Sequence, residues 1–111
     1  MTDIIIDGQL IPQDNEGYLR EMSDWTPAVA EQLARQEGIA LTDAHWEILN
    51  VLRAFYQKFE LSPAMRPLVK AVAAELGPDK GKSIYLMSLF PGSPAKLTSK
   101  IAGLPKPTNC L

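Results

Sequence analysis

A long apolar stripe between Thr42 and Phe59 constrains the fold more than any other part of the chain. Thr42 is a suitable N-cap for a helix over about 43–59. The apolar side chains of this segment recur at helical spacing: Trp46, Leu49, Leu52, Tyr56 and Phe59 form the stripe, and Ile48, Val51 and Phe55 broaden it. We interpret the stripe as core rather than as a ligand site.

Further segments carry their own helix signals. Thr26 and Pro27 predict an N-cap and a first helical residue, and Gly38 is a natural stop. Pro67 lies inside another helical pattern, where it either kinks the helix or marks its true first turn. The expected helices run from Pro27 to about Glu37, from Ser62-Pro63 to just before Gly77, over about 83–90, and within 95–102.

Residues 3–11 show the signature of a β-hairpin. Two β-branched runs flank Asp7-Gly8, a dipeptide suited to the positive φ angles of a type I′ turn. An isolated hairpin is only marginally stable, so we expect it to pack against the helices. The predicted fold class is therefore mainly α: a small helical bundle with an N-terminal β-hairpin.

Length and composition exclude several classes of protein. A chain of 111 residues is expected to form one domain. No apolar stretch approaches the ~20 residues of a membrane span, and the N-terminus lacks the features of a signal peptide. The single cysteine excludes an internal disulfide, and no cluster of His and Cys offers a metal site. We therefore expect a cytoplasmic protein with no metal, no cofactor and no membrane partner.

The net charge of −2 hides an asymmetry. Residues 1–55 carry ten acids against three arginines, a net of −7, whereas residues 56–111 carry eight bases against three acids, a net of +5. A basic half that also holds the cysteine favours an anionic partner or substrate near the thiol. The alternative is a set of lysines that only solvate separate faces.

The chain after Gly103 reads as neither helix nor strand. Pro105 and Pro107 fix φ and lack N–H donors, which favours a stiff, polyproline-like segment. At about 3.1 Å per residue, such a segment would carry Cys110 roughly 20 Å from its last anchor. We therefore divide the chain into a helical domain, 1–103, and a flexible, mobile C-terminal arm, 104–111. The arm suits delivery of a thiol to another protein; an unused cysteine in a frayed terminus is the alternative.

Short motifs spread over nearly the whole chain resemble the DsrC/TusE family of sulfur carriers. They are Glu16-Gly17-Tyr18-Leu19, Glu37-Gly38-Ile39, His45-Trp46-Glu47, Ser62-Pro63-Ala64, Leu89-Phe90-Pro91, Gly92-Ser93-Pro94-Ala95-Lys96 and Lys100-Ile101-Ala102-Gly103-Leu104-Pro105-Lys106-Pro107. Each motif is weak alone, but together, in order and before a penultimate cysteine, they are specific. The resemblance implies an orthogonal helical bundle with a β-hairpin and a mobile arm.

Ser99 separates two branches of that family. The branch that works with dissimilatory sulfite reductase carries a second arm cysteine eleven positions before the penultimate one, and Ser99 occupies that position here. A serine cannot complete an intramolecular disulfide or trisulfide. The chain is therefore similar to the single-cysteine TusE branch.

The resemblance implies a sulfurtransferase without stand-alone turnover, in which Cys110 takes up persulfide sulfur and relays it for 2-thiolation of the tRNA wobble uridine. It also implies a TusBCD-like donor complex and an MnmA-like tRNA thiouridylase, with its tRNA, as acceptor. Exchange of sulfur between thiols needs access and reach but no built-in base. The carboxylate of Leu111 disfavours the thiolate, so we expect a docked partner to activate it. The expected partner-binding residues are Lys100, Gly103, Pro105, Lys106 and Pro107.

Two other functions stay open. The first is a DsrC-like gamma subunit associated with dissimilatory sulfite reductase, which Ser99 disfavours. The second is a non-catalytic helix-turn-helix module that binds nucleic acid through helices 43–59 and 62–76, although Arg66 and Lys70 are the only cations of the second helix. His45, the only histidine, lies in the first turn of the long helix, where we expect capping or surface packing rather than catalysis.

Overall fold

The computed structural model describes residues 3–108. Its elements are β1 (Ile4–Ile6), β2 (Gln9–Ile11), the 3-10 helix η1 (Met22–Asp24), α1 (Pro27–Gln36), α2 (Asp43–Phe59), α3 (Met65–Leu76), α4 (Ser83–Leu89) and α5 (Pro94–Ile101). The predicted mainly α fold with an N-terminal β-hairpin is confirmed.

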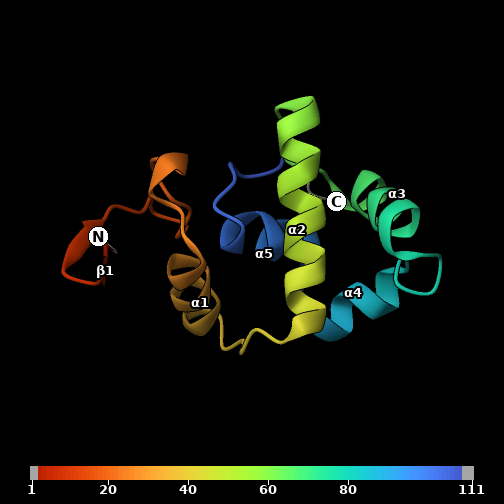
Figure 1. Cartoon of the computed structure of the whole chain (residues 1–111), viewed down its shortest axis with the longest axis horizontal. Coiled ribbons are helices and arrows are strands. Elements are labelled where there is room, and N and C mark those ends of the chain that lie inside the picture. The colour runs from red at the N-terminus through yellow and green to blue at the C-terminus, as the bar shows by residue number, and fades with distance from the viewer. Residues whose placement is uncertain (1–2, 109–111) are drawn as a thin grey trace.

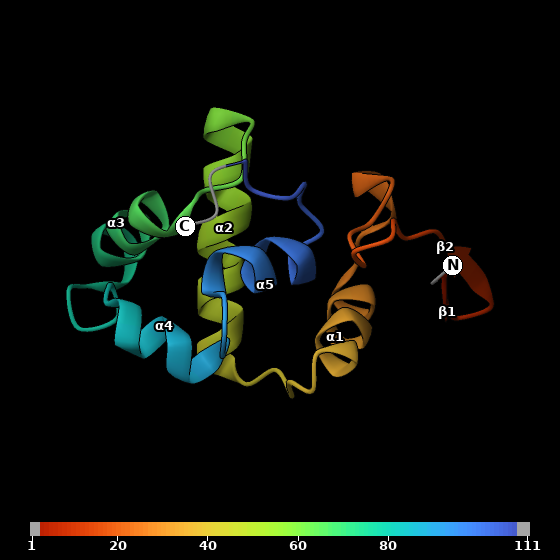
Figure 2. The same ribbon diagram turned by 180° about the vertical axis from the view of Figure 1, so that it is seen from behind.

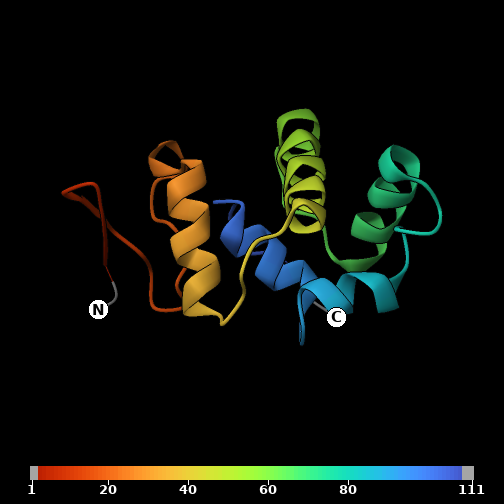
Figure 3. The ribbon, with the colours of Figure 1, turned by 60° about the horizontal axis from the view of Figure 1, so that its bottom comes forward.

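The helix α2 stands at the centre of the molecule. Figure 1 shows α1 on one side of α2, with the hairpin beyond it, and α3 and α4 on the other side. From behind, α5 lies across α2 (Figure 2), and it contacts both α1 and α2. Figure 3 shows α1, α2 and α3 upright and side by side, with α4 and α5 running across them. The bundle is therefore orthogonal, and its last helix, α5, packs across the central helix α2.

The hairpin forms as the sequence predicts. Its strands β1 and β2 are antiparallel, and Asp7 and Gly8 have φ angles of 51° and 78°, as a type I′ turn requires. The cross-strand pair of Ile4 and Ile11 is buried and holds the hairpin on the body. The other face of the hairpin is exposed.

The predicted start of α3 is wrong by a few residues. The helix begins at Met65, with Ala64 as its N-cap. Ser62 and Pro63 are buried in the turn that precedes it, and the Ser62 hydroxyl donates a hydrogen bond to a carbonyl near the chain end instead of capping the helix. Pro67 lies in the first turn of α3, where its missing N–H costs no intrahelical hydrogen bond.

The apolar stripe of α2 forms the core along most of its length. Ile48, Leu49 and Leu52 are fully buried. The stripe ends earlier than predicted, because Phe59 is 51% exposed and its ring packs against Phe55 with a centroid distance of 4.6 Å. Trp46 and Tyr56 are only partly buried.

His45 caps α2 and also ties it to α4, so the expected capping role is confirmed. The Thr42 backbone N–H donates to Nδ1 at 3.1 Å, which leaves the proton of a neutral ring on Nε2. Nε2 therefore donates to the Leu89 carbonyl at 2.9 Å. The ring also meets Phe90 edge-on, with centroids 5.1 Å apart. Both ring nitrogens of His45 are therefore used in structural hydrogen bonds.

The helix α5 is the most deeply buried of the short elements. Thr98, Ser99 and Ile101 have no exposed surface, and neither does Ala102 just beyond the helix. Because α5 lies between α1 and α2, the body fixes the point at which the chain enters its C-terminal segment. Within residues 3–108, no helix has the length and apolar character needed to cross a membrane.

The contacts of His45 predict a graded loss of stability. Thr42→Ala removes one side-chain cap and should lower the free energy of unfolding by about 1 kcal/mol. His45→Ala removes the cap, a buried hydrogen bond and ring packing, and should cost ~2–4 kcal/mol. Urea unfolding followed by circular dichroism measures both, and equal losses would show that the link to α4 contributes nothing.

Candidate functional site

Cys110, the predicted sulfur-carrying residue, lies outside the described residues. The structure describes the segment that leads to it, and we call residues 101–107 the arm root. The arm root leaves the end of α5 and passes α2 (Figures 1 and 2); residues 101–104 and 107 are buried, and residues 105 and 106 are exposed. Its contacts determine where the chain departs toward the cysteine.

Trp25 and Arg53 hold the first part of the arm root. The Trp25 indole Nε1 donates a hydrogen bond to the Ile101 carbonyl at 2.9 Å. The Arg53 guanidinium carbon lies 3.8 Å from the centroid of the Trp25 ring, within cation–π range. Its Nη1 donates to the Ala102 carbonyl at 2.6 Å. Partial burial lowers the pKa of Arg53, but an arginine stays charged at neutral pH.

The close approach of Trp25 to the main chain requires a glycine at position 103. Its φ is +76°, in the left-handed region that disfavours L side chains. A Cβ at this position would lie 2.4 Å from Cδ1 of Trp25. The indole therefore lies directly against the backbone of the arm root, and only glycine leaves room for it.

The packed body extends beyond Gly103. Leu104 is 2% exposed and belongs to the hydrophobic core, and its N–H donates to the Ser99 carbonyl at 2.9 Å. The Ser62 hydroxyl donates to the Pro105 carbonyl, and Pro107 is buried. The described part of the predicted arm thus packs on the body. The mobility of segment 104–111 stays a prediction.

The two lysines expected to bind partners form ion pairs within the chain. Lys100 Nζ lies 3.2 Å from a Glu37 carboxylate oxygen, and Lys106 Nζ lies 2.8 Å from one of Glu16. The Lys106–Glu16 pair is the more exposed, with 41% and 57% of the side-chain surfaces accessible. Exposed ion pairs contribute little to stability. Partner binding by these lysines stays a prediction.

Ser99, the residue that separates the two family branches, is fully buried in α5. Its hydroxyl oxygen has no hydrogen-bond partner among the residues described. A buried hydroxyl without a partner is unfavourable, so this side chain contributes no polar contact that stabilises α5.

An open hollow of about 620 Å³ lies beside the arm root. The loop after the hairpin and the arm root form it together, and its lining includes Tyr18, Arg20, Met22, Pro105 and Lys106. Within residues 3–108 no cluster of three or more His, Cys, Asp or Glu residues could hold a metal ion.

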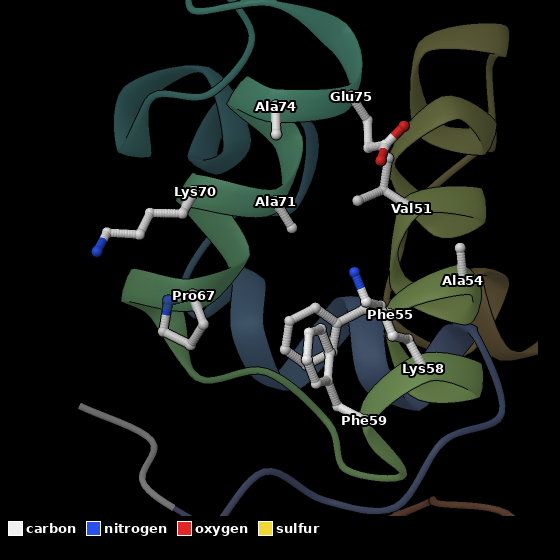
Figure 4. Close-up of a pocket in the computed structure, with 10 residues that line it drawn as sticks. All are labelled: Val51, Ala54, Phe55, Lys58, Phe59, Pro67, Lys70, Ala71, Ala74 and Glu75. Carbon is white, nitrogen blue, oxygen red and sulfur yellow. The ribbon is translucent and has the colours of Figure 1, made fainter.

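A second hollow, of about 440 Å³, lies between α2 and α3. Figure 4 shows Phe55 and Phe59 on one wall and Pro67, Ala71 and Ala74 of α3 on the other. Lys58 and Lys70 are the cations in its lining, and the Lys70 nitrogen points away from the hollow (Figure 4). Nucleic-acid interfaces carry denser positive charge, so this apolar surface gives the helix-turn-helix alternative no support.

Trp25 and Arg53 were not identified from the sequence. Trp25 lies outside every predicted helix, and Arg53 appears only as one polar residue on an amphipathic helix. The available signal was a tryptophan directly before a helix cap, which indicates an anchored loop. Nothing in the sequence shows that the two side chains meet the carbonyls of residues 101 and 102.

Comparisons with known proteins agree on one family. The family model described as "DsrC like protein" matches residues 5–111. Sulfurtransferase TusE from Yersinia pseudotuberculosis is 54% identical over 105 residues, which cover 95% of this chain and 97% of that protein. Sulfurtransferase TusE from Photorhabdus laumondii is 51% identical over 111 residues, and the match covers 100% of both chains.

Solved structures share the fold. The NMR structure of Allochromatium vinosum DsrC has a TM-score of 0.89 and 49% identity, covering 98% of this chain and 97% of that one. The oxidised gamma subunit of dissimilatory sulfite reductase (DsrC) from Archaeoglobus fulgidus has a TM-score of 0.86 and 37% identity, with 99% and 100% coverage.

The contact between Trp25 and Gly103 predicts a difference between two glycines. Gly38 and Gly103 have similar φ angles, +73° and +76°, but a Cβ at Gly38 would meet nothing within 4 Å. Gly38→Ala should therefore cost only the ~1–2 kcal/mol of a left-handed alanine. Gly103→Ala should cost a further ~1–3 kcal/mol, because the new methyl group overlaps the indole. Urea titration measures both, and equal losses would contradict the close contact.

Proposed function

The chain belongs to the DsrC-like family, and from that premise we propose that it is a sulfur carrier, a sulfurtransferase of the TusE kind that relays persulfide sulfur through Cys110 for thiolation of tRNA. The observation that carries the proposal is identity of 51–54% to proteins named sulfurtransferase TusE over nearly the full length of both chains. The role of Cys110 rests on its being the only cysteine of the chain.

The chemistry is an exchange at sulfur that needs no external oxidant. The Cys110 thiolate attacks the outer sulfur of a donor persulfide, a new S–S bond forms, and the donor's S–S bond breaks. The donor leaves as a thiolate, and Cys110 now carries the outer sulfur and its proton. In the second step an acceptor thiolate attacks that outer sulfur and releases the Cys110 thiolate. Each step makes and breaks one S–S bond.

The helical body holds the chain that carries the thiol, but it supplies no histidine that could deprotonate Cys110. His45, the only histidine, is committed to the Thr42 cap and to the Leu89 carbonyl. No described histidine is therefore available as a base for Cys110. Activation then falls to the docked partner, which lowers the thiol pKa with positive charge or backbone dipoles.

The partners we propose are a TusBCD-like donor complex and an MnmA-like thiouridylase with its tRNA, acting in the cytoplasm. Lys100, just before the arm root, and Lys106, within it, would exchange their intramolecular carboxylates for acidic groups of the partner. Gly103, Pro105 and Pro107 set the course of the backbone at that contact. A DsrC-like role with sulfite reductase is disfavoured, because Ser99 offers no second thiol.

The carrier role of Cys110 is tested by removing its thiol and by moving a single thiol to another position. The protein is incubated with a cysteine desulfurase and its substrate, and intact mass spectrometry should show one added sulfur atom on wild type and none on Cys110→Ser. A Cys110→Ser, Ser88→Cys double variant keeps one thiol, moved to an exposed position on α4. It should relay no sulfur to tRNA, because its thiol is not on the arm. Relay by Cys110→Ser at the wild-type rate would end the proposal.

A second test concerns Lys106. Lys106→Gln should slow partner association several-fold at low salt and little at high salt, because exposed charges act mainly on encounter rates and are screened. Lys82→Gln, an exposed lysine at the start of α4, is the matched control and should change nothing. Stopped-flow kinetics across ionic strength measure both. Identical rates for wild type and Lys106→Gln at every salt concentration would show that Lys106 is only solubilising.

A further inference from the structure

The arm root is held by side chains from three separate parts of the chain. Trp25 precedes α1, Arg53 lies in the middle of α2, and Ser62 lies in the turn before α3. Each donates a hydrogen bond to a different main-chain carbonyl of the arm root, those of Ile101, Ala102 and Pro105. We call Trp25, Arg53 and Ser62 the clamp.

The clamp donates hydrogen bonds to main-chain carbonyls that have no partner within a helix or strand. After α5 the carbonyls of residues 101 and 102 are the unpaired groups of a helix end, and Pro105 and Pro107 have no N–H with which to form a ladder. Backbone of this kind is normally solvated and mobile. Here side chains bind it, and the core burial of Leu104 reinforces them.

Resting on the proposed function, we propose that Trp25, Arg53 and Ser62 are positioning residues for sulfur transfer, because they fix the arm root and so place the departure point of the thiol-bearing chain at Pro107. Extended chain spans at most ~3.6 Å per residue, so Cys110 lies within about 11 Å of Pro107. Without the clamp the last fixed point is Leu104 in the core, and the limit rises to about 22 Å.

The consequence is a higher effective concentration of the thiol at a docked partner. Effective concentration falls roughly as the −3/2 power of tether length, so lengthening the tether from three residues to six dilutes the thiol about threefold. Docking through exposed charges such as that of Lys106 should be largely unaffected, because those charges stay on the chain when the clamp is released. Loss of the clamp should therefore lower the rate of sulfur transfer within the complex and leave partner affinity unchanged.

The test uses full-length Ser62→Ala and Arg53→Lys, separately and together. The matched controls are Ser88→Ala, which also removes a serine bond to a main-chain carbonyl, and Arg35→Lys, which removes an exposed arginine bond on α1. All are compared at a temperature where circular dichroism shows them folded, and Ser62→Ala keeps the test valid if Arg53→Lys is too unstable. Single-turnover transfer from the persulfide form to the acceptor enzyme should fall about threefold in the clamp variants. KM and alkylation of Cys110 by iodoacetamide should not change.

An insertion series separates positioning from a structural role. Gly-Ser units are inserted after Thr108 in wild type and in the Ser62→Ala, Arg53→Lys background. With the clamp intact, the first inserts should slow sulfur transfer steeply. With the clamp released, the same inserts should slow transfer only slightly further, because the free chain before Cys110 is already longer. A purely structural role predicts parallel curves, and parallel curves overturn the proposal.

A distance measurement that requires no sulfur transfer tests this inference separately from the function on which it rests. Nitroxide labels on Cys110 and on a Ser88→Cys site allow pulsed EPR to measure their distance distribution. The distribution should broaden when the clamp is released; an unchanged width overturns the proposal, as does broadening with no change in transfer rate. If wild type accepts no sulfur, the proposed function is wrong and the positioning role falls with it, whereas the EPR widths still decide whether the clamp fixes the arm root.

Discussion

The stacking of Arg53 on Trp25 is the interaction on which the C-terminal part of the structure depends. It joins the segment before α1 to the middle of α2, and both side chains then bind carbonyls at the end of α5. An arginine is suited to this position, because its planar guanidinium can stack on a ring and donate at its edge. Since α5 is enclosed by α1 and α2, the same contacts determine where the chain leaves the body.

With this arrangement, we propose that a sulfur carrier acts by positioning its thiol rather than by activating it. The exchange reaction needs a nucleophilic sulfur that reaches two different partners, and strong permanent activation would expose it to oxidation. The only histidine is used in the fold, and the lysines near the arm root are paired with carboxylates. On the proposed function, the chain presents the Cys110 thiol, and we propose that a docked partner activates it.

The sequence predicted what depends on local patterns and missed what depends on tertiary contacts. The turn at Asp7-Gly8, the cap at Thr42 and the stop near Gly38 followed from local chemistry, and the structure confirms them. The start of α3 was wrong because Ser62, a good cap by residue type, bonds to the distant Pro105 carbonyl instead. The exposure of Phe59 and the pairing of Trp25 with Arg53 depend on how helices pack, which spacing along one helix does not encode. The family motifs pointed to Cys110 and to the arm root but not to the side chains that hold it.

Direct transfer of sulfur from this chain to the tRNA pathway is the central claim. It is tested most directly by loading the protein with radioactive sulfur, removing the donor, and mixing the product with acceptor enzyme and tRNA in the presence of excess unlabelled sulfide. We expect one labelled sulfur per loaded chain to appear in thiolated tRNA in a single turnover, undiluted by the sulfide. Label diluted by the free sulfide would show that sulfur leaves the chain before it reaches the acceptor, and would contradict a relay through the chain's own thiol.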